Sequence, residues 1–166
     1  MRNYEERAKD FIKEIYPYFT DMEDYWDVQS SVYSYNNDHH RNVKVKSGIA
    51  RIALVTSDYV VKFTYNEYYA EEVGGGEEEV DVYRQAEKDG FGYLFAKVTR
   101  FTYHGQDFYI MPRIRYINPN RRHYAYYYMT EAERKWCHKH CINDLHNENY
   151  GFRDGHVCVF DYACNR

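Results

Sequence analysis

The segment from Asp144 to Asp161 constrains the fold more than any other part of the sequence. It begins with Asp144-Leu-His-Asn-Glu-Asn149, which puts a carboxylate and an amide into one short polar stretch. Asp154-Gly155 then predicts a tight turn, and residues 157–160 form a short apolar run of the kind found in strands. We therefore predict a polar loop followed by a β-hairpin, with Asp161 at the end of the second strand.

These polar side chains suit phosphoryl transfer. That reaction needs a group that orients and deprotonates the attacking hydroxyl, and it needs oxygen ligands that hold Mg²⁺ against the nucleotide phosphates. The carboxylates of Asp144 and Asp161 and the amide oxygen of Asn149 are groups of these kinds. Because Asp and Asn are also common in turns, the alternative is a solvated loop and hairpin without a catalytic role.

The order of these residues resembles the catalytic loop and metal-binding aspartate of the protein-kinase-like superfamily. This superfamily includes eukaryotic-type protein kinases and kinases related to the aminoglycoside phosphotransferases. The resemblance implies ATP and Mg²⁺ as cofactors, Asp144 as catalytic base, and Asn149 and Asp161 as metal ligands. It also implies an α+β, protein-kinase-like two-lobed fold, in which an antiparallel sheet and one helix form the N-lobe above a minimal C-lobe.

The sequence departs from the superfamily pattern in three places. Ile142-Asn143 stands where a histidine normally precedes the aspartate, and Asp161-Tyr162-Ala163 stands in place of Asp-Phe-Gly. The sequence ends at Arg166, so we expect a C-lobe truncated after the metal site. Such a lobe would not hold a protein substrate as a full kinase does.

The N-terminal half contains signals for a helix and a hairpin. Residues 3–16 place apolar side chains on one helical face, and Pro17 is expected to end that helix. Residues 27–42 are rich in Ser, Asn, Asp and His and predict a loop or an irregular strand. The apolar segments 47–56 and 59–64 are separated by a two-residue turn, which predicts a β-hairpin.

Three residues in this half are candidates for the nucleotide site. Lys62 follows two valines, as the phosphate-contacting lysine does in kinases, and Gly48 would belong to the phosphate-covering loop. An exposed strand lysine is the alternative for Lys62. Residues 77–88 predict a helix with an acidic first turn. The resemblance implies that Glu79 of this helix pairs with Lys62, with Glu78 as the alternative, although an acidic first turn can also merely stabilise the helix end.

Two more strands and a helix complete the expected order. Residues 93–103 and 106–111 predict strands around a His104-Gly105 turn. The resemblance places Met111 at the hinge between the lobes, where main-chain groups bind adenine, although the following proline lacks an N–H. Thr130 is predicted to cap a helix over residues 131–141, with Glu133 at its third position completing a capping box.

Two other residue groups suggest different chemistry. Cys137-His-Lys-His-Cys141, with His146 nearby, contains zinc-type ligands, but one helical face could supply only about two of the four that structural zinc needs. Cysteines that pack the helix are the expected alternative. The run from Arg121 to Tyr128 mixes cations with aromatics, as proteins that bind single strands do. In a chain with 21 tyrosines, a Tyr-rich core or surface is the simpler interpretation.

Length and composition favour a single domain over residues 1–166, with an N-terminal helix and irregular extension in 1–44, the N-lobe in 45–111, and the hinge and truncated C-lobe in 112–166. The abundance of Tyr predicts an aromatic core. A net charge of −4 argues against binding to duplex nucleic acid. The absence of a signal peptide or membrane span, with four cysteines, fits the cytoplasm. The Tyr- and Asn-rich usage suggests an AT-rich, viral genome, in which case the location is the host cytoplasm.

We therefore expect an ATP- and Mg²⁺-dependent phosphotransferase whose partner is a nucleotide. One alternative is a degenerate pseudokinase that binds nucleotide or a protein partner without catalysis. The other is a binding module in which the acidic motif is accidental. Retention of Asp144, Asn149 and Asp161 favours the enzyme, because a pseudoenzyme is free to lose them.

Overall fold

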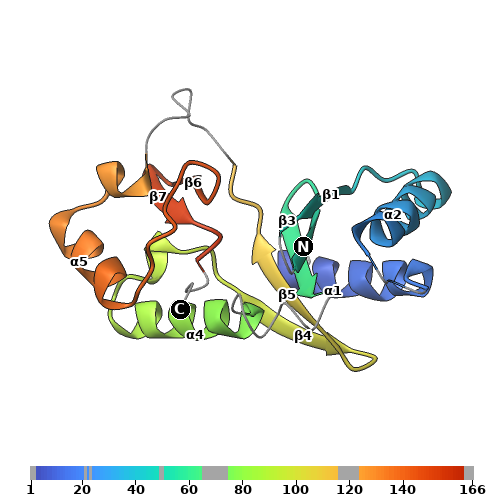
Figure 1. Ribbon diagram of the computed structural model, residues 1–166, viewed down its shortest axis with the longest axis horizontal. Coiled ribbons are helices and arrows are strands. Elements are labelled where there is room, and N and C mark those ends of the chain that lie inside the picture. The colour runs from blue at the N-terminus through green and yellow to red at the C-terminus, as the bar shows by residue number, and fades with distance from the viewer. Residues whose placement is uncertain are drawn as a thin grey trace. The chain divides into compact units, whose positions relative to one another are not determined.

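The computed structural model describes residues 3–20, 22, 24–48, 51–64, 75–115 and 124–162. Over these residues the chain is α+β, with a five-stranded antiparallel sheet, a two-stranded hairpin and four α-helices (Figure 1). The predicted class and the antiparallel sheet are thus confirmed. The chain forms two compact units, the first comprising Met1–Val73 and Thr99–Arg113, and the second Gly74–Val98 and Ile114–Arg166. No helix within the described ranges is long and apolar enough to cross a membrane.

The sheet of the first unit has the strand order β1-β2-β3-β5-β4, and all neighbours are antiparallel. Its strands are β1 (Lys44–Ser47), β2 (Arg51–Val55), β3 (Tyr59–Thr64), β4 (Thr99–Tyr103) and β5 (Gln106–Pro112). The two predicted turns are confirmed. The β2–β3 turn is closed by a hydrogen bond from the Thr56 N–H to the Tyr59 carbonyl at 3.0 Å. His104 and Gly105 have φ angles of 50° and 80°, which suit a type I′ turn between β4 and β5.

The strand predicted over residues 93–103 is shorter than expected. Gly92–Leu94 forms the 3-10 helix η2, and only Thr99–Tyr103 pairs in the sheet. The preceding segment belongs to the second unit, where the N–H of Ala96 donates to the carbonyl of Val159 at 2.8 Å. The strand predicted over 47–56 is likewise interrupted, because Gly48 lies in the connection between β1 and β2.

The first helix, α1 (Tyr4–Ile15), follows the prediction. The Asn3 side chain accepts a hydrogen bond from the Glu6 N–H at 2.9 Å, and Pro17 falls in the 3-10 helix η1 (Tyr16–Tyr18) that follows. The predicted apolar stripe is buried at Ala8, Phe11, Ile12 and Ile15 and partly buried at Tyr4.

The prediction of a loop or irregular strand over residues 27–42 is wrong. These residues lie largely within α2 (Tyr25–His39), which begins with a capping box between Asp24 and Asp27. Its buried face is narrow and consists of Val28, Val32 and Tyr35. Because helical spacing brings these three side chains together on the core, the many polar residues between them fall on the solvent side.

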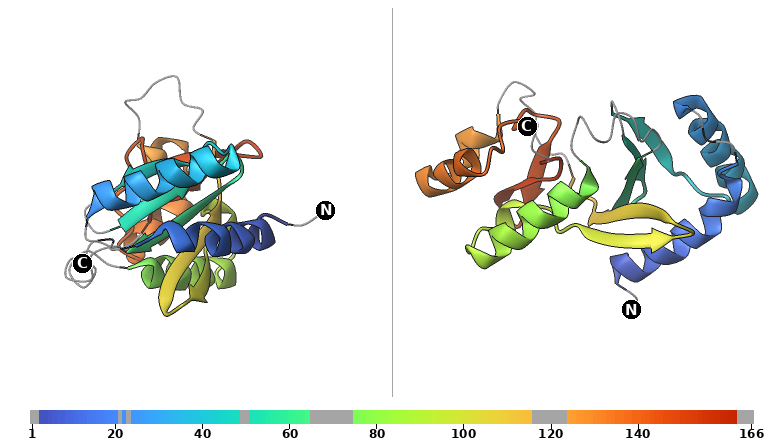
Figure 2. Two further views of the ribbon diagram at one scale, coloured as in Figure 1. Left: turned by 90° about the vertical axis from the view of Figure 1, so that its right-hand side faces the viewer. Right: turned by 60° about the horizontal axis from the view of Figure 1, so that its bottom comes forward.

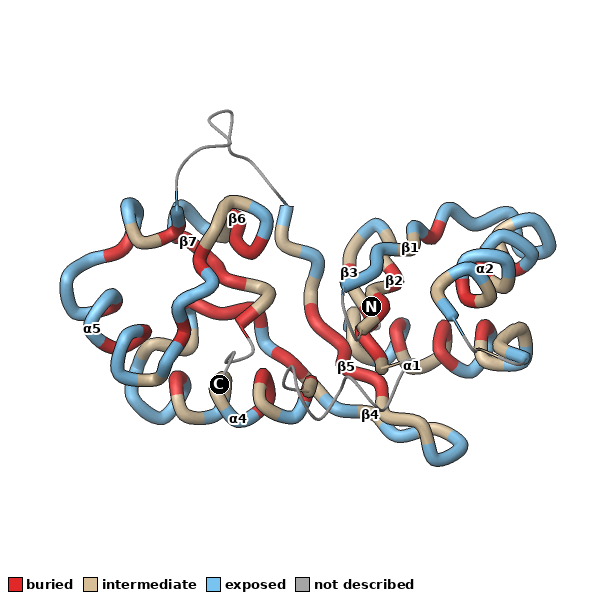
Figure 3. Tube along the Cα trace, in the orientation of Figure 1, coloured by how far each residue is buried: buried red, intermediate tan, exposed pale blue. Residues whose placement is uncertain are grey.

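The core of the first unit lies between α1, α2 and one face of the sheet (Figures 1 and 2). Alternate residues of the strands supply that face, namely Ile52, Leu54, Val61, Phe63, Phe108 and Ile110. Since side chains alternate along a strand, Lys62 lies on the opposite face, with Ala53 and Tyr109 as its cross-strand neighbours. Buried residues follow β3 and β5 closely (Figure 3).

The second unit contains two α-helices and a small hairpin that follows the second of them. Its elements are α4 (Gly76–Lys88), η2, the 3-10 helix η3 (Ala125–Tyr128), α5 (Glu131–Lys139), β6 (Tyr150–Arg153) and β7 (His156–Val159). The capping box predicted for α5 is present between Thr130 and Glu133. The indole N–H of Trp136 in α5 donates to Asp89 at the end of α4 at 2.9 Å. The helix that we assigned to the N-lobe, α4, thus belongs to the same unit as α5.

The expected aromatic core is confirmed. Tyr35, Tyr150 and Tyr162 are among the largest fully buried side chains. Buried phenol groups need hydrogen-bond partners, and the Tyr35 hydroxyl donates to Glu14 at 3.0 Å. Desolvation by burial, followed by this bond, raises the pKa of Tyr35 to about 12.

Candidate functional site

The loop that contains Asp144 is anchored at both ends. After α5 the N–H of Ile142 donates to the carbonyl of Cys137 at 2.9 Å, and the N–H of Ala125 in η3 donates to the carbonyl of Leu145 at 2.7 Å. Ile142 and Leu145 are both buried. Asp144 lies between these two apolar anchors, and its own side chain is half exposed. The loop therefore presents a carboxylate to solvent from a fixed backbone.

Asn149 connects this loop to the open end of the hairpin, where the second strand ends. Its side-chain Nδ2 donates to the Asp144 carbonyl at 3.0 Å, and its own carbonyl accepts from the Phe160 N–H at 2.9 Å. Only 7% of Asn149 is exposed. Phe160 immediately precedes Asp161, so the backbone at all three predicted site positions is brought together. The hydrogen bond to Asp144 uses the amide nitrogen, whereas a metal ion would bind the amide oxygen.

The hairpin between Asn149 and Asp161 forms as predicted. Tyr150 pairs with Val159 and Arg153 with His156, while Asp154 and Gly155 take φ angles of 52° and 81° in the turn. Both angles are positive, as a type I′ turn requires.

Gly151 of β6 is required by close packing. A Cβ added there would lie 2.6 Å from the carbonyl oxygen of Arg115 and 2.7 Å from Cγ2 of Ile114. The segment at 114–115 therefore fits against the hairpin only because position 151 has no side chain.

The residue after Asp161 fixes the end of the hairpin in the interior. Tyr162 is 1% exposed, and its hydroxyl donates to the carbonyl of Ala96 at 2.6 Å. Its ring meets that of Phe95 edge to face, with the centroids 4.9 Å apart. Asp161 itself is half buried, directly before this anchor.

An imidazole lies beside Asp144, a neighbour that we did not predict. Nε2 of His146 is 3.3 Å from Oδ1 of Asp144, and Nδ1 of His146 accepts a hydrogen bond from the Glu148 N–H at 3.2 Å. From the sequence His146 had been considered only as a zinc ligand. The short separation of Asp144 and His146 in the sequence is the signal that could have indicated this contact. Their side chains meet, however, only because of the turn that follows Asp144.

The candidates of the first unit occupy the following positions. Lys62 lies in β3 and is 7% exposed, so the alternative of an exposed strand lysine is wrong. Gly48 follows β1, and its N–H donates to the carbonyl of Arg51 at 2.8 Å across the turn. Met111 was expected at the hinge between the lobes, but it lies within β5, where it is buried and pairs with Val60. The boundary between the two units falls after Arg113.

Of the two glutamates considered as partners for Lys62, Glu79 is the more buried. Glu79 has no exposed surface, whereas Glu78 is intermediate. Glu79 belongs to the second unit and Lys62 to the first. Their pairing stays a prediction.

A zinc site near the cysteines finds no support. Among the residues that the structure describes, no three His, Cys, Asp or Glu side chains gather as a metal-binding group. Cys137 is buried, and desolvation by burial followed by the charge of Glu133 raises the pKa of its thiol to about 12. Its burial confirms the expected packing function, although Cys141 is exposed.

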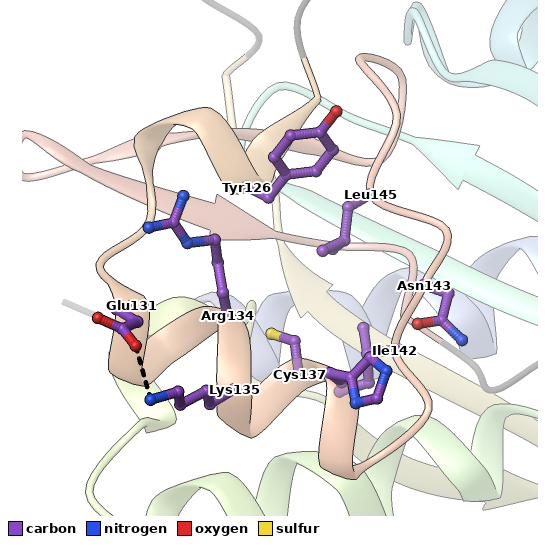
Figure 4. A pocket seen from close by; sticks show the side chains of 9 residues that line it. Tyr126, Glu131, Arg134, Lys135, Cys137, Ile142, Asn143 and Leu145 are labelled. Carbon is purple, nitrogen blue, oxygen red and sulfur yellow. Dashed lines mark ion pairs between the residues drawn. The ribbon is translucent and has the colours of Figure 1, made fainter.

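A pocket of about 420 Å³ lies beside the loop (Figure 4). Tyr126 of η3, Arg134 and Lys135 of α5, and Asn143 and Leu145 of the loop contribute to its walls. Its full lining is Tyr126, Glu131, Arg134, Lys135, Cys137, His138, Ile142, Asn143 and Leu145. Lys135 is paired with Glu131 at 2.6 Å.

The tyrosine run at the edge of this pocket lies mainly at the surface. Tyr124, Tyr127 and Tyr128 are exposed, and the rings of Tyr124 and Tyr126 are stacked with centroids 5.3 Å apart. The arginines and the histidine that precede them in the sequence, residues 121–123, lie outside the described residues. The Tyr-rich surface expected as the simpler interpretation is present.

Comparison of the chain with protein-family models, with curated proteins and with solved structures found no match of any kind.

Proposed function

We propose that the protein is an ATP- and Mg²⁺-dependent phosphotransferase. Asp144 orients and deprotonates the acceptor hydroxyl, while Asn149 and Asp161 bind Mg²⁺ with their oxygens. Two protein ligands suffice for this ion, since Mg²⁺ usually keeps several waters and takes further oxygens from the nucleotide phosphates. In this proposal the protein positions charges and contributes little covalent chemistry, as phosphoryl transfer requires.

One observation carries the proposal: Asn149 is buried and is hydrogen-bonded to both Asp144 and Phe160. A solvated loop would not need a buried asparagine that accepts from residue 160 and donates to residue 144. The side-chain bond fixes the amide beside the backbone of Asp144, and the backbone bond fixes Asn149 beside Phe160, the residue before Asp161. That arrangement suits a metal site, which depends on ligands placed in advance.

The nucleotide side of the proposed site includes Lys62. Lys62 is buried in β3, and a buried ammonium group must be compensated by a nearby anion or by polar groups. We assign Lys62 to the nucleotide phosphates and Glu79 to its orientation, with Gly48 covering the phosphates and the strand end at Met111 contacting the base. The order of elements along the chain, from β1 to the β6–β7 hairpin, agrees with the order that the kinase resemblance implies.

Thermal unfolding with Mg²⁺ and ATP tests nucleotide binding. At a ligand concentration about 100-fold above Kd, binding stabilises the folded state by about 2.7 kcal/mol. For a chain of this size that corresponds to a rise of about 5–10 °C in Tm. Asp161→Asn should abolish the rise, whereas the matched change Asp154→Asn, at an exposed aspartate in the hairpin turn, should leave it intact. A wild-type protein without any stabilisation would refute the proposal.

Transfer itself is tested with labelled ATP. Asp144→Ala should retain the thermal shift and lose turnover, because the base is not a metal ligand. Stabilisation of the wild type without turnover under any condition would instead identify a pseudokinase that binds nucleotide.

A second candidate, a protein-binding module, is favoured by two aromatic side chains of α2. Trp26 and Tyr33 are 67% and 68% exposed, and their spacing of two helical turns puts them on the same side of the helix. Exposed aromatics on one helix face are typical of binding surfaces. If a partner binds there, the double variant Trp26→Ala, Tyr33→Ala should lose that partner and keep the Mg²⁺–ATP shift.

A further inference from the structure

The loop after Asp144 is built so that one residue fixes two others. Asn149 donates through its side chain to the carbonyl of Asp144 at 3.0 Å and through its backbone N–H to the carbonyl of His146 at 3.0 Å. Both residues are therefore held by the same buried side chain and backbone. Their side chains meet, with Nε2 of His146 at 3.3 Å from Oδ1 of Asp144.

The other ring nitrogen determines where the imidazole proton resides. Nδ1 of His146 accepts a hydrogen bond from the N–H of Glu148 at 3.2 Å, so it must carry a lone pair. In the neutral ring the proton is then on Nε2, the nitrogen that lies beside the Asp144 carboxylate. The backbone of the loop thus selects the tautomer that can donate to Asp144.

We propose that His146 is a positioning residue for Asp144. This inference rests on the proposed phosphotransferase function. The Nε2–H of His146 occupies Oδ1 of Asp144 and limits rotation of the carboxylate, which leaves Oδ2 to accept the proton of the acceptor hydroxyl. The two positions directly before Asp144 are Ile142 and Asn143, and the imidazole beside the aspartate comes from the C-terminal side instead. Since both side chains are partly exposed, the contact contributes to orientation and little to stability.

The contact can be tested without turnover by the ¹⁵N chemical shifts of the His146 ring at neutral pH. We expect a protonated Nε2 and an unprotonated Nδ1, and Asp144→Asn should shift the Nε2 resonance. Asp154→Asn is the matched control and should leave the ring unchanged. A proton on Nδ1, or an Nε2 resonance that is indifferent to Asp144→Asn, would overturn the proposal.

Kinetics test the consequence for transfer. His146→Ala should lower kcat about tenfold, as loss of an orienting partner does, with the KM for ATP unchanged. His146→Gln keeps an N–H donor and should recover most of the rate, whereas His138→Ala, an exposed histidine of α5, should have no effect. Equal losses for Gln and Ala, or a changed KM for ATP, would contradict positioning. If the wild type fails to transfer phosphate, the proposed function is refuted but the contact between His146 and Asp144 is not. The ¹⁵N shifts of the His146 ring test that contact independently of turnover.

Discussion

Replacing Tyr162 with Phe tests how the end of the hairpin at Asp161 is held. The substitution keeps the ring that packs against Phe95 and removes only the hydroxyl that donates to the Ala96 carbonyl at 2.6 Å. Ala96 is fully buried, so water does not replace the lost donor. A buried carbonyl left without its partner costs about 1–3 kcal/mol. We expect a loss of about 2 kcal/mol in the free energy of unfolding, or about 6 °C in Tm.

The assay is urea unfolding followed by the fluorescence of Trp136, whose ring centroid is 5.5 Å from that of Phe95. A Trp26→Phe background removes the signal of the first unit at little cost, because Trp26 is largely exposed. Tyr124→Phe serves as the control, since its ring is exposed and its free energy should change by less than about 0.5 kcal/mol. Equal midpoints for the Tyr162 and Tyr124 variants would show that the Tyr162 hydroxyl makes no interior hydrogen bond.

Three further perturbations have defined outcomes. Burial pushes the pKa of Glu133 upward, but the hydrogen bonds from its neighbouring hydroxyl and N–H donors bring it to a net value below the ordinary one. The stabilisation of the folded state by the Glu133 carboxylate is therefore fully present above the ordinary glutamate pKa. It is lost as the pH falls through the lowered pKa of Glu133 in the folded protein. Glu133→Gln should cost about 1 kcal/mol at neutral pH in urea unfolding, with the difference from wild type disappearing in acid. Gly151→Ala should lower the Tm of the second unit by several degrees, because the added Cβ would lie 2.6 Å from a backbone carbonyl oxygen. Gly48→Ala is the control, since its Cβ would lie at an ordinary 3.6 Å from the nearest backbone oxygen. Equal losses of Tm for the two variants would contradict the close packing at Gly151. Iodoacetamide at pH 8 should alkylate exposed Cys141 and spare buried Cys137 until urea is added, as peptide mass mapping would detect.

The two N-terminal helices illustrate what sequence patterns reveal. α1 has a broad apolar stripe and was predicted with nearly correct ends, since Asn3 and Pro17 mark its limits. α2 buries only a narrow face, so few apolar residues mark its helical periodicity. Its polar composition therefore led to the prediction of a loop. Its remaining signal was the Asp24–Asp27 capping box, which is short and also common in turns.

The candidate site was predictable as far as it depends on local order. The loop, the Asp154-Gly155 turn and the approach of Asn149 to the end of the hairpin follow from residue spacing, because a two-residue hairpin returns the chain to its start. The burial of Lys62 and the contact of His146 with Asp144 were not predictable in this way. The first depends on packing between distant segments, and the second on the path of a few backbone dihedral angles.

The pairing of β6 with β7 limits how the sequence around this site can change in length. Asn149 and Phe160 are joined just outside the first pair of the hairpin, Tyr150 with Val159. Adding a residue to each strand would lengthen the ribbon and return Asp161 to the same side. Adding one residue to a single strand would turn Asp161 to the opposite face, since side chains alternate along a strand. Natural or engineered variants that keep a metal site here should therefore gain or lose residues between Asn149 and Asp161 in pairs.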